Sequence, residues 1–282
     1  MGRNEGNVSG KYPEEIERIV DGLTLFDDNL MSRVFENNVK ATELLLRIIF
    51  NRTIKVKTVN GQAKLLSHEI DGKNIVLDIM AENEDGTLMD IEVQGDAAGA
   101  DIKRARYYSS MLDTKALKKG EDYKDMRDTY VIFICRQDSF EKGLPAYHIS
   151  RFLEENSQRI NDGSHIIYLN GSYSGDDDFG RLMSDFHQNN YREINFPVLA
   201  EGVRFFKEDE GGRADMCDAV KEYANEQSKI AEERAKIQAN VNAVNVLMKN
   251  HQLSLNQALN ELGITGDAKE AVEEELKKEK VS

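Results

Sequence analysis

The chain has few cysteines and no long apolar run, and both absences narrow the classes of protein to which it can belong. Its two cysteines among 282 residues, Cys135 and Cys217, are far apart, and neither has a histidine or cysteine at metal-ligand spacing. A disulfide framework and a zinc site are therefore excluded, and the composition fits a reducing cytoplasm. No apolar stretch approaches the roughly 18 residues of a membrane-spanning helix, and residues 1–11 lack the apolar core of a secretory signal. We expect a cytoplasmic protein with no membrane partner.

Basic residues are also in short supply, because 51 acidic side chains against 37 basic ones leave a net charge of −14. That balance argues against a protein that coats nucleic acid. The distribution is uneven, however. Residues 44–67 contain no acid and several bases, a second basic group lies at 103–106, and much of the excess acid falls at 232–233 and 273–275. The basic segments suit a polyanionic substrate, although a solvated surface would give the same pattern.

The stretch 74–94 is typical of a β-hairpin, because two short β-like runs flank an Asp-Gly turn at 85–86. Side chains of a strand alternate between its faces, so odd and even positions are considered separately. The odd positions are all apolar and predict a core face: Ile75, Leu77, Ile79, Met89, Ile91 and Val93. The even positions collect the acids: Val76, Asp78, Met80, Asp90, Glu92 and Gln94.

A register centred on Asp85 places Asp78 directly across from Glu92, with Cβ atoms roughly 4.5–5.5 Å apart. Two carboxylates this close repel each other unless a cation lies between them or one is protonated. Mg²⁺ or Mn²⁺, which prefer hard oxygen ligands, are the natural cations for the pair. The alternative is a half-exposed hairpin whose solvent-facing side carries acids because the whole chain is acidic.

Helices are expected on both sides of the hairpin. Apolar spacing over 28–50, interrupted at Asn37-Asn38, predicts two helices, and their acids Asp28, Glu36 and Glu43 are alternatives for facing the hairpin. After the hairpin, 101–112 predicts a helix in which Arg106 lies on a different face from the apolar stripe, and Tyr107 beside it is free to face a cleft. The polar residues of this helix could clamp a phosphate or could be ordinary snorkelling side chains. They are Lys103, Arg104, Arg106 and Tyr107.

Beyond this helix, the continuous apolar run 130–135 predicts a central buried strand, joined to the hairpin by a right-handed crossover. Residues 165–169 predict a similar strand. We expect a flexible tail over 1–22, an α/β domain over 23–211 and an α-helical C-terminal extension over 212–282. Its short last helices, the first with a capping box at 254–257, only loosely resemble a helix-turn-helix. Such helices are more often packing or oligomerisation elements, so we expect any homo-oligomer to form through them.

The ordered set of motifs resembles the PD-(D/E)XK phosphodiesterase superfamily and, within it, the bacterial nuclease family transposases related to recombination-promoting nucleases. The resemblance covers roughly 23–212 and rests on these segments: Leu25-Phe26-Asp27-Asp28, 41–49, 77–94, 103–111, 120–123, 130–134 and 162–171. It implies a restriction-endonuclease-like core, a mixed central sheet flanked by helices. It also implies metal-dependent cleavage of DNA phosphodiesters, associated with recombination or mobile elements.

On this resemblance Asp78 matches the first sheet acid of the family and Glu92 the second, while Leu77 replaces the usual preceding proline. Gln94 stands where lysine is usual, and a neutral amide can orient water but carries no charge. The implied ligands of Mg²⁺ or Mn²⁺ are Asp78, Glu92, the carbonyl of Val93, and one helical acid, Glu43 before Asp28. The implied catalytic residues are Asp78, Glu92 and Gln94. The implied DNA contacts are Arg106, Arg104, Lys103 and Tyr107.

Two other functions remain open. A degenerate nuclease fold could act as a nucleic-acid or protein interaction module, and the chain could be a structural protein assembled through its C-terminal helices. The hydrolytic interpretation requires the carboxyl groups of Asp78 and Glu92 to face each other. Carboxyl groups that point apart, or that salt bridges to basic neighbours seal from solvent, would favour a scaffold.

Overall fold

A computed structural model describes residues 11–66 and 73–279, and the first ten residues of the expected tail lie outside this range. The chain divides into two compact units, Met1–Ala219 and Val220–Ser282. The boundary expected at 211–212 falls within a continuous helix, α7 (Glu210–His251). In the described part of the chain, no helix is both long and apolar enough to cross a membrane.

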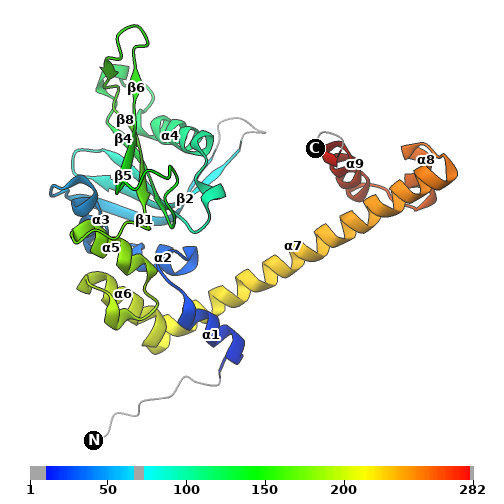
Figure 1. Cartoon of the computed structure of the whole chain (residues 1–282), viewed down its shortest axis with the longest axis horizontal. Helices are drawn as coiled ribbons and strands as arrows, with labels where there is room; N and C mark the ends of the chain where they lie inside the picture. Colours follow the sequence, from blue (N-terminus) through cyan, green and yellow to red (C-terminus); the bar gives the residue numbers. More distant parts are fainter. Residues whose placement is uncertain (1–10, 67–72, 280–282) are drawn as a thin grey trace, which may run out of the picture. The chain divides into compact units, whose positions relative to one another are not determined.

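The first unit is built on a mixed sheet, which has six strands in the described residues, in the order β1-β2-β3-β4-β8-β5 (Figure 1). Its strands are β1 (Val56–Leu65), β2 (Ile75–Asn83), β3 (Leu88–Gln94), β4 (Thr129–Cys135), β5 (Ala146–Ile149) and β8 (Ser164–Asn170). β3, β4 and β8 run parallel, whereas β1, β2 and β5 are antiparallel to their neighbours. A short separate ribbon pairs β6 (Arg151–Phe152) with β7 (Arg159–Ile160).

The hairpin of β2 and β3 forms in the predicted register. Ile79 pairs with Ile91 and Met80 with Asp90, so the same register continued by one step sets Asp78 across from Glu92. All the odd positions of the hairpin are buried, as predicted, but they do not share one core face, because Ile75 and Leu77 pack in the same apolar cluster as the even positions Met80 and Leu88. Gly86 in the turn has φ +88°, a left-handed conformation that glycine adopts without strain.

The central strand β4 explains the continuous apolar run of the sequence. It lies between β3 and β8 and pairs with both in parallel, so both of its faces are covered. Its residues 131–134 are 0 % exposed. The preceding helix α4 (Ile102–Ala116) packs against β3, β4 and β8 and connects β3 to β4. The predicted strand–helix–strand crossover is therefore present.

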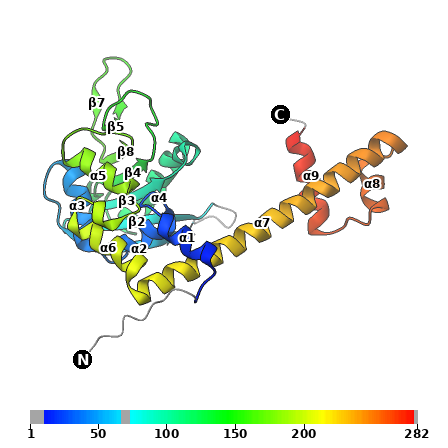
Figure 2. The same cartoon turned by 60° about the horizontal axis from the view of Figure 1, so that its bottom comes forward.

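Helices cover the sheet from both sides (Figures 1 and 2). α4 lies on one side, and α2, α3, α5 and α6 gather on the other. The helices of this group are α2 (Asp28–Phe35), α3 (Val39–Phe50), α5 (Asp178–His187) and α6 (Pro197–Glu208). Three short 3-10 turns complete the unit, η1 (Ala97–Ala100), η2 (Tyr123–Asp125) and η3 (Tyr191–Glu193). This architecture is the predicted α/β class, a mixed sheet flanked by helices with a helical C-terminal region.

Local sequence fixes where these helices begin. The break predicted at Asn37-Asn38 separates α2 from α3; Asn37 has φ +54°, and the Asn38 side chain accepts a hydrogen bond from the amide of Ala41. The Asp101 carboxylate accepts hydrogen bonds from the amides of Lys103 and Arg104 and so caps α4. Such caps satisfy donors that the first helical turn leaves unpaired.

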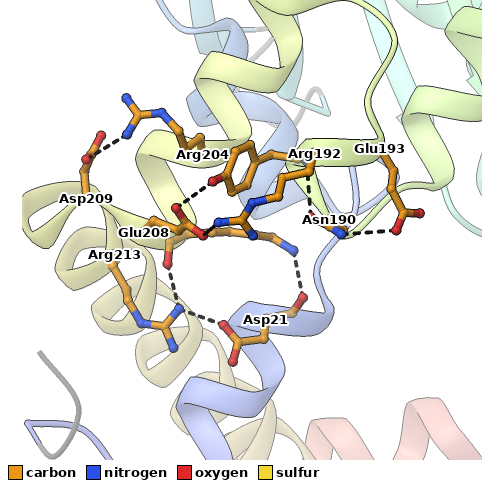
Figure 3. Close-up of polar contacts among 10 residues, drawn as sticks. Asp21, Asn190, Arg192, Glu193, Arg204, Glu208, Asp209 and Arg213 are labelled. Atoms are coloured by element: carbon orange, nitrogen blue, oxygen red, sulfur yellow. Dashed lines mark hydrogen bonds and ion pairs between the residues drawn. The ribbon is translucent and has the colours of Figure 1, made fainter. Parts of the chain in front are cut away.

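The expected flexible tail is wrong over its second half, because α1 (Glu14–Gly22) is a helix whose Val20 is buried. Lys207 of α6 holds its end in place. The Lys207 ammonium is buried and donates to the carbonyl oxygens of Asp21, Leu23 and Asn189 at 2.8, 2.6 and 2.7 Å. Burial lowers the pKa of Lys207 to about 8. Arg213 of α7 adds hydrogen bonds to the Asp21 carboxylate and the Lys207 carbonyl (Figure 3).

The second unit has a small apolar core of its own, formed by the end of α7 with α8 (Leu255–Glu261) and α9 (Asp267–Glu279). Its buried residues are Val241, Val244, Ala258, Leu259, Ile264, Val272 and Leu276. The predicted capping box is present, since Ser254 and Gln257 exchange side-chain and backbone hydrogen bonds. These helices confirm the α-helical character expected for the C-terminal region.

Candidate functional site

The two opposed acids of the hairpin interlock through their backbones. The Asp78 amide donates to Glu92 Oε1 at 3.0 Å, and the Val93 amide donates to Asp78 Oδ2 at 3.0 Å. Each carboxylate therefore accepts a hydrogen bond from a backbone amide of the opposite strand. The carboxyl groups face each other across the ribbon, as the sequence predicts.

This acidic face is not the solvent-facing side of a half-exposed hairpin. α4 covers it, and both Asp90 and Glu92 are 0 % exposed, whereas Asp78 and Gln94 stay partly accessible. Among the even positions, Val76 at the start of β2 is 40 % exposed. The site thus lies at the edge of the α4 interface, where a buried acid meets an accessible one.

Arg104 of α4 is the cation that meets the buried acid. Its Nη2 donates to Glu92 Oε2 at 2.7 Å, and its Nη1 donates to Gln94 Oε1 at 3.1 Å and to the Gly99 carbonyl at 2.7 Å. The guanidinium also lies 4.9 Å from the ring centroid of Tyr108. A salt bridge to a basic neighbour therefore covers Glu92, which is one of the two findings expected if the domain were a scaffold and not an enzyme.

The sequence-based preference for Arg106 as the principal phosphate contact is not supported by its position. Arg106 is exposed and makes no hydrogen bond or ion pair within residues 11–66 and 73–279, whereas Arg104 lies among the acids. Lys103 is also exposed. The Tyr107 hydroxyl donates to the carbonyl of Lys73 at 2.6 Å and so ties α4 to the segment before β2.

A glycine makes room for the Gln94 amide. A Cβ atom at Gly99, in η1, would clash with Gln94 Oε1, and it would lie 3.6 Å from Arg104 Nη1. Because the Gly99 carbonyl also accepts from Arg104, this turn positions the amide and the guanidinium together. Arg104 bonds to the Gln94 oxygen, and the Gln94 NH₂ group has no hydrogen-bond partner within residues 11–66 and 73–279.

Of the helical acids, Asp28 is the one that joins the pair. Its carboxylate accepts from Gln62 Nε2 at 3.4 Å and interacts electrostatically with Asp78 and Arg104. Glu43, which the sequence ranks first, is engaged elsewhere: it accepts from the Val56 amide at 3.1 Å and pairs with Lys55 at 3.6 Å. Glu36 is exposed. The third acid of the candidate site is therefore Asp28.

Protonation is favoured at every acid of the site. Burial, reinforced by the charges of Glu92 and Asp28, raises the pKa of Asp78 to about 8. Burial likewise raises the pKa of Glu92, and it raises the pKa of Asp90 well above its ordinary value. Asp28 is exposed, and its partial desolvation raises its pKa. Neither carboxyl oxygen of Asp90 has a hydrogen-bond partner among the described residues.

Four carboxyl groups lie near Arg104, and the charge of Arg33 acts in addition on Asp28, so among the described residues the carboxylates of the cluster outnumber the guanidiniums. Unpartnered carboxyl oxygen and excess negative charge fit a hard divalent cation, whose preferred ligands are carboxylates and carbonyls. In the described residues, no three acidic, histidine or cysteine side chains already stand at ligand distances from one point. The donor chemistry fits a metal ion, and its binding requires the side chains to rearrange.

Arg136 is a candidate that sequence reasoning missed. Its amide donates to the Gln94 carbonyl at 2.9 Å, directly after β4, and its guanidinium lies 4.9 Å from the Phe26 ring centroid. In the described chain the side chain has a single, long hydrogen bond, from Nη2 to Thr24 Oγ1 at 3.4 Å, and no acidic partner. The sequence feature that could have identified Arg136 is its position directly after a buried strand, at the edge of the sheet where parallel strands end.

Comparison with known proteins agrees with this geometry. The sequence model of the PD-(D/E)XK nuclease family transposases matches residues 30–172, half of the chain, and this range includes every acid of the site except Asp28. No curated protein and no solved structure matches the chain. With a mixed sheet flanked by helices and the signature acids on adjacent strands, the chain belongs to the PD-(D/E)XK nuclease family transposases.

Proposed function

We propose that the protein is a metal-dependent endonuclease that hydrolyses DNA phosphodiester bonds, in connection with recombination or mobile elements. The observation that carries this proposal is the pair Asp78 and Glu92, which face each other across the hairpin with a third acid beside them. Family membership supports nuclease chemistry. The charge imbalance of the cluster supports a divalent cation.

The residues that would hold Mg²⁺ or Mn²⁺ are Asp78, Glu92 and the carbonyl of Val93, with Asp28 in place of Glu43. When bound, the ion would lower the pKa of a coordinated water and neutralise charge at the phosphorus centre. Asp90, two positions before Glu92 on β3, is buried, and its raised pKa favours the protonated form, so it would not be a ligand of the ion.

The other residues position the reactants. Gln94 orients the attacking water through its NH₂ group, because Arg104 already occupies its oxygen. Arg104 neutralises Glu92 until the cation arrives and then contacts a phosphate oxygen, for which a planar guanidinium is well suited. Arg136 lies beside Gln94 and contacts the same DNA strand, and the exposed Lys103 and Arg106 bind phosphates farther along it.

A plasmid-nicking assay in Mg²⁺ tests the proposal directly. Asp78→Ala should reduce the rate by more than about a hundredfold, since metal catalysis supplies several kcal/mol and each tenfold is about 1.4 kcal/mol. Asp122→Ala, at an exposed acid outside the site, is the matched control and should cut like the wild type. Equal nicking by the wild type and Asp78→Ala discards the hydrolytic function.

One observation favours a second function, a nuclease fold that acts as an interaction module. The salt bridge from Arg104 seals Glu92, and Gln94 carries no charge to replace the usual lysine. Calorimetry separates the two functions. A nuclease should bind Mg²⁺ in the millimolar range through Asp78, and the heat of Mg²⁺ binding should be lost in Asp78→Ala. An interaction module need show no heat of Mg²⁺ binding in the wild type or in the variant.

A further inference from the structure

A cavity of about 270 Å³ opens at the end of β3 opposite to Gln94. We call it the turn pocket. The end of α3, the β2–β3 turn and the segment leading into β4 surround it. Its polar and aromatic lining includes Phe50, Arg52, Asp85, Thr87, Arg127 and Tyr130. None of these residues belongs to the candidate nuclease site, so the turn pocket calls for a separate explanation.

The turn pocket contains unused hydrogen-bond donors. Across the part of the chain that the structure describes, Arg52 and Arg127 make no hydrogen bond and no ion pair, and the Tyr130 hydroxyl has no hydrogen-bond partner. Arg52 instead lies over the Phe50 ring, 6.0 Å from its centroid. Two guanidiniums and a hydroxyl from three different segments form a set of donors suited to a tetrahedral oxyanion.

The acids of the turn pocket form their hydrogen bonds with other partners, although the charge of Arg127 also acts on Asp85. Asp85 Oδ1 accepts from the Thr87 amide at 3.0 Å and from the Thr87 hydroxyl at 2.6 Å, and these hydrogen bonds lower the pKa of Asp85. Asp128 Oδ2 lies 3.1 Å from His165 Nε2. Both acids rigidify the wall, and neither forms a salt bridge with an arginine of the pocket.

One wall of the pocket is aromatic. Phe50 meets Tyr130 edge to face with ring centroids 5.0 Å apart, and Tyr130 stacks on His165 at 4.3 Å. Met89 and Met126 complete the lining. Aromatic and methionine side chains of this kind receive planar rings, and ligand pockets typically combine such walls with a few polar groups.

We propose that the turn pocket binds a phosphate monoester of mononucleotide size. Arg52, Arg127 and the Tyr130 hydroxyl take the phosphate, and the Phe50–Tyr130 wall receives the base. The carboxylates of Asp85 and Asp128 at the same pocket repel additional phosphates, and the cavity is small for a ligand site. Both features favour a free mononucleotide over the backbone of a nucleic-acid strand.

Calorimetry on the full chain tests this proposal with deoxyadenosine 5′-monophosphate as the probe. The mononucleotide should bind more tightly than inorganic phosphate or deoxyadenosine alone, because it uses both parts of the pocket. Arg52→Gln and Arg127→Gln should each weaken binding roughly tenfold, the effect of losing a hydrogen bond to a charged group. Arg159→Gln, at an exposed arginine outside the pocket, should bind like the wild type.

Three results would overturn the proposal. The first is no binding of the mononucleotide to the wild type, and the second is equal binding by an Arg52→Gln/Arg127→Gln double variant whose thermal unfolding matches the wild type. The third is tighter binding of a single-stranded 12-mer with the same dependence on both arginines, which would assign the pocket to the polymer. Asp78→Ala should retain mononucleotide binding, so a failure of the nuclease proposal leaves this test intact.

Discussion

Asp78 is held in a position that is unfavourable for its charge. The Val93 amide stabilises one carboxyl oxygen, yet the group is largely buried beside Glu92 and Asp28, and its pKa rises to about 8. The folded protein therefore keeps a proton on Asp78 over a pH range in which the unfolded chain has lost it. Stability from this proton is fully present below about pH 3.8 and is lost as the pH rises through about 8.

We therefore predict that the melting temperature without divalent ions falls between pH 6 and pH 8.5, and that Asp78→Asn flattens this fall. The asparagine oxygen can still accept from the Val93 amide, while the charge that repels Glu92 and Asp28 is gone. The exposed Asp122→Asn is the control and should follow the wild-type curve. Parallel curves for Asp78→Asn and the wild type over this pH range would contradict the assignment.

The residue scale also shows what a sequence can and cannot specify. Alternation within the hairpin predicts which side chains share a face, because a strand has a fixed period of two, and the structure agrees at Asp78 and Glu92. The choice of Arg104 over Arg106 depends on which face of α4 meets the sheet, a tertiary fact. The choice of Asp28 over Glu43 has the same origin, since the approach of α2 to β2 decides it.

At the scale of elements, a buried lysine from a distant helix holds the end of α1 in place. The Lys207 ammonium satisfies three carbonyl oxygens, two near the end of α1 and one in the loop before η3, which the chain brings together from distant positions. Residues 1–22 contain few apolar side chains, and such a composition predicts a flexible tail. A lysine almost two hundred positions away, in α6, supplied the missing partner.

We predict that Lys207→Met lowers the free energy of unfolding by about 3 kcal/mol, because methionine fills the volume but leaves three buried carbonyl oxygens without a donor. Urea unfolding followed by circular dichroism measures the change. Lys124→Met removes an exposed lysine and should stay within about 0.5 kcal/mol of the wild type. A Lys207→Met protein as stable as the wild type would show that water replaces the ammonium.

The packing of elements also explains why the burial of Asp90 and Glu92 cannot be predicted from the local sequence. The apolar spacing of 101–112 predicts a helix, and α4 confirms it, but nothing local indicates that this helix lies over the even positions of β2 and β3. The strand order places β4 beside β3, and the crossover then carries α4 across the acidic face. Asp90 and Glu92 are buried as a consequence of topology.

At the scale of the whole molecule, two compact units meet at Ala219–Val220 within the sequence of one long helix. The contacts that tie the start of α7 to the first unit come before that point. Arg213 binds Asp21, and Arg33 binds Asp215 at 2.8 Å. The first unit, with the complete candidate site, therefore ends after these contacts. We propose that any homo-oligomer forms through the second unit.

We predict that a chain ending at Ala219 folds with a melting temperature within a few degrees of the first transition of the full protein and keeps the Mg²⁺-dependent heat. Light scattering should show a monomer, whatever the state of the full chain. A chain ending at Gly211 is the informative comparison, because it also loses the Arg213 and Asp215 contacts and should melt lower. An oligomer that persists in the Ala219 chain would place the assembly surface on the first unit.

The hairpin carries three acids of the site on adjacent strands, whereas their counter-ion comes from the helix that follows. A ribosome delivers residues in order, so the negative ribbon leaves the exit tunnel before Arg104 does. During that interval Arg104 is not available, and ions or protons from the surroundings must neutralise these carboxylates. Early folding of this protein should therefore respond to the supply of free magnesium at the site of translation.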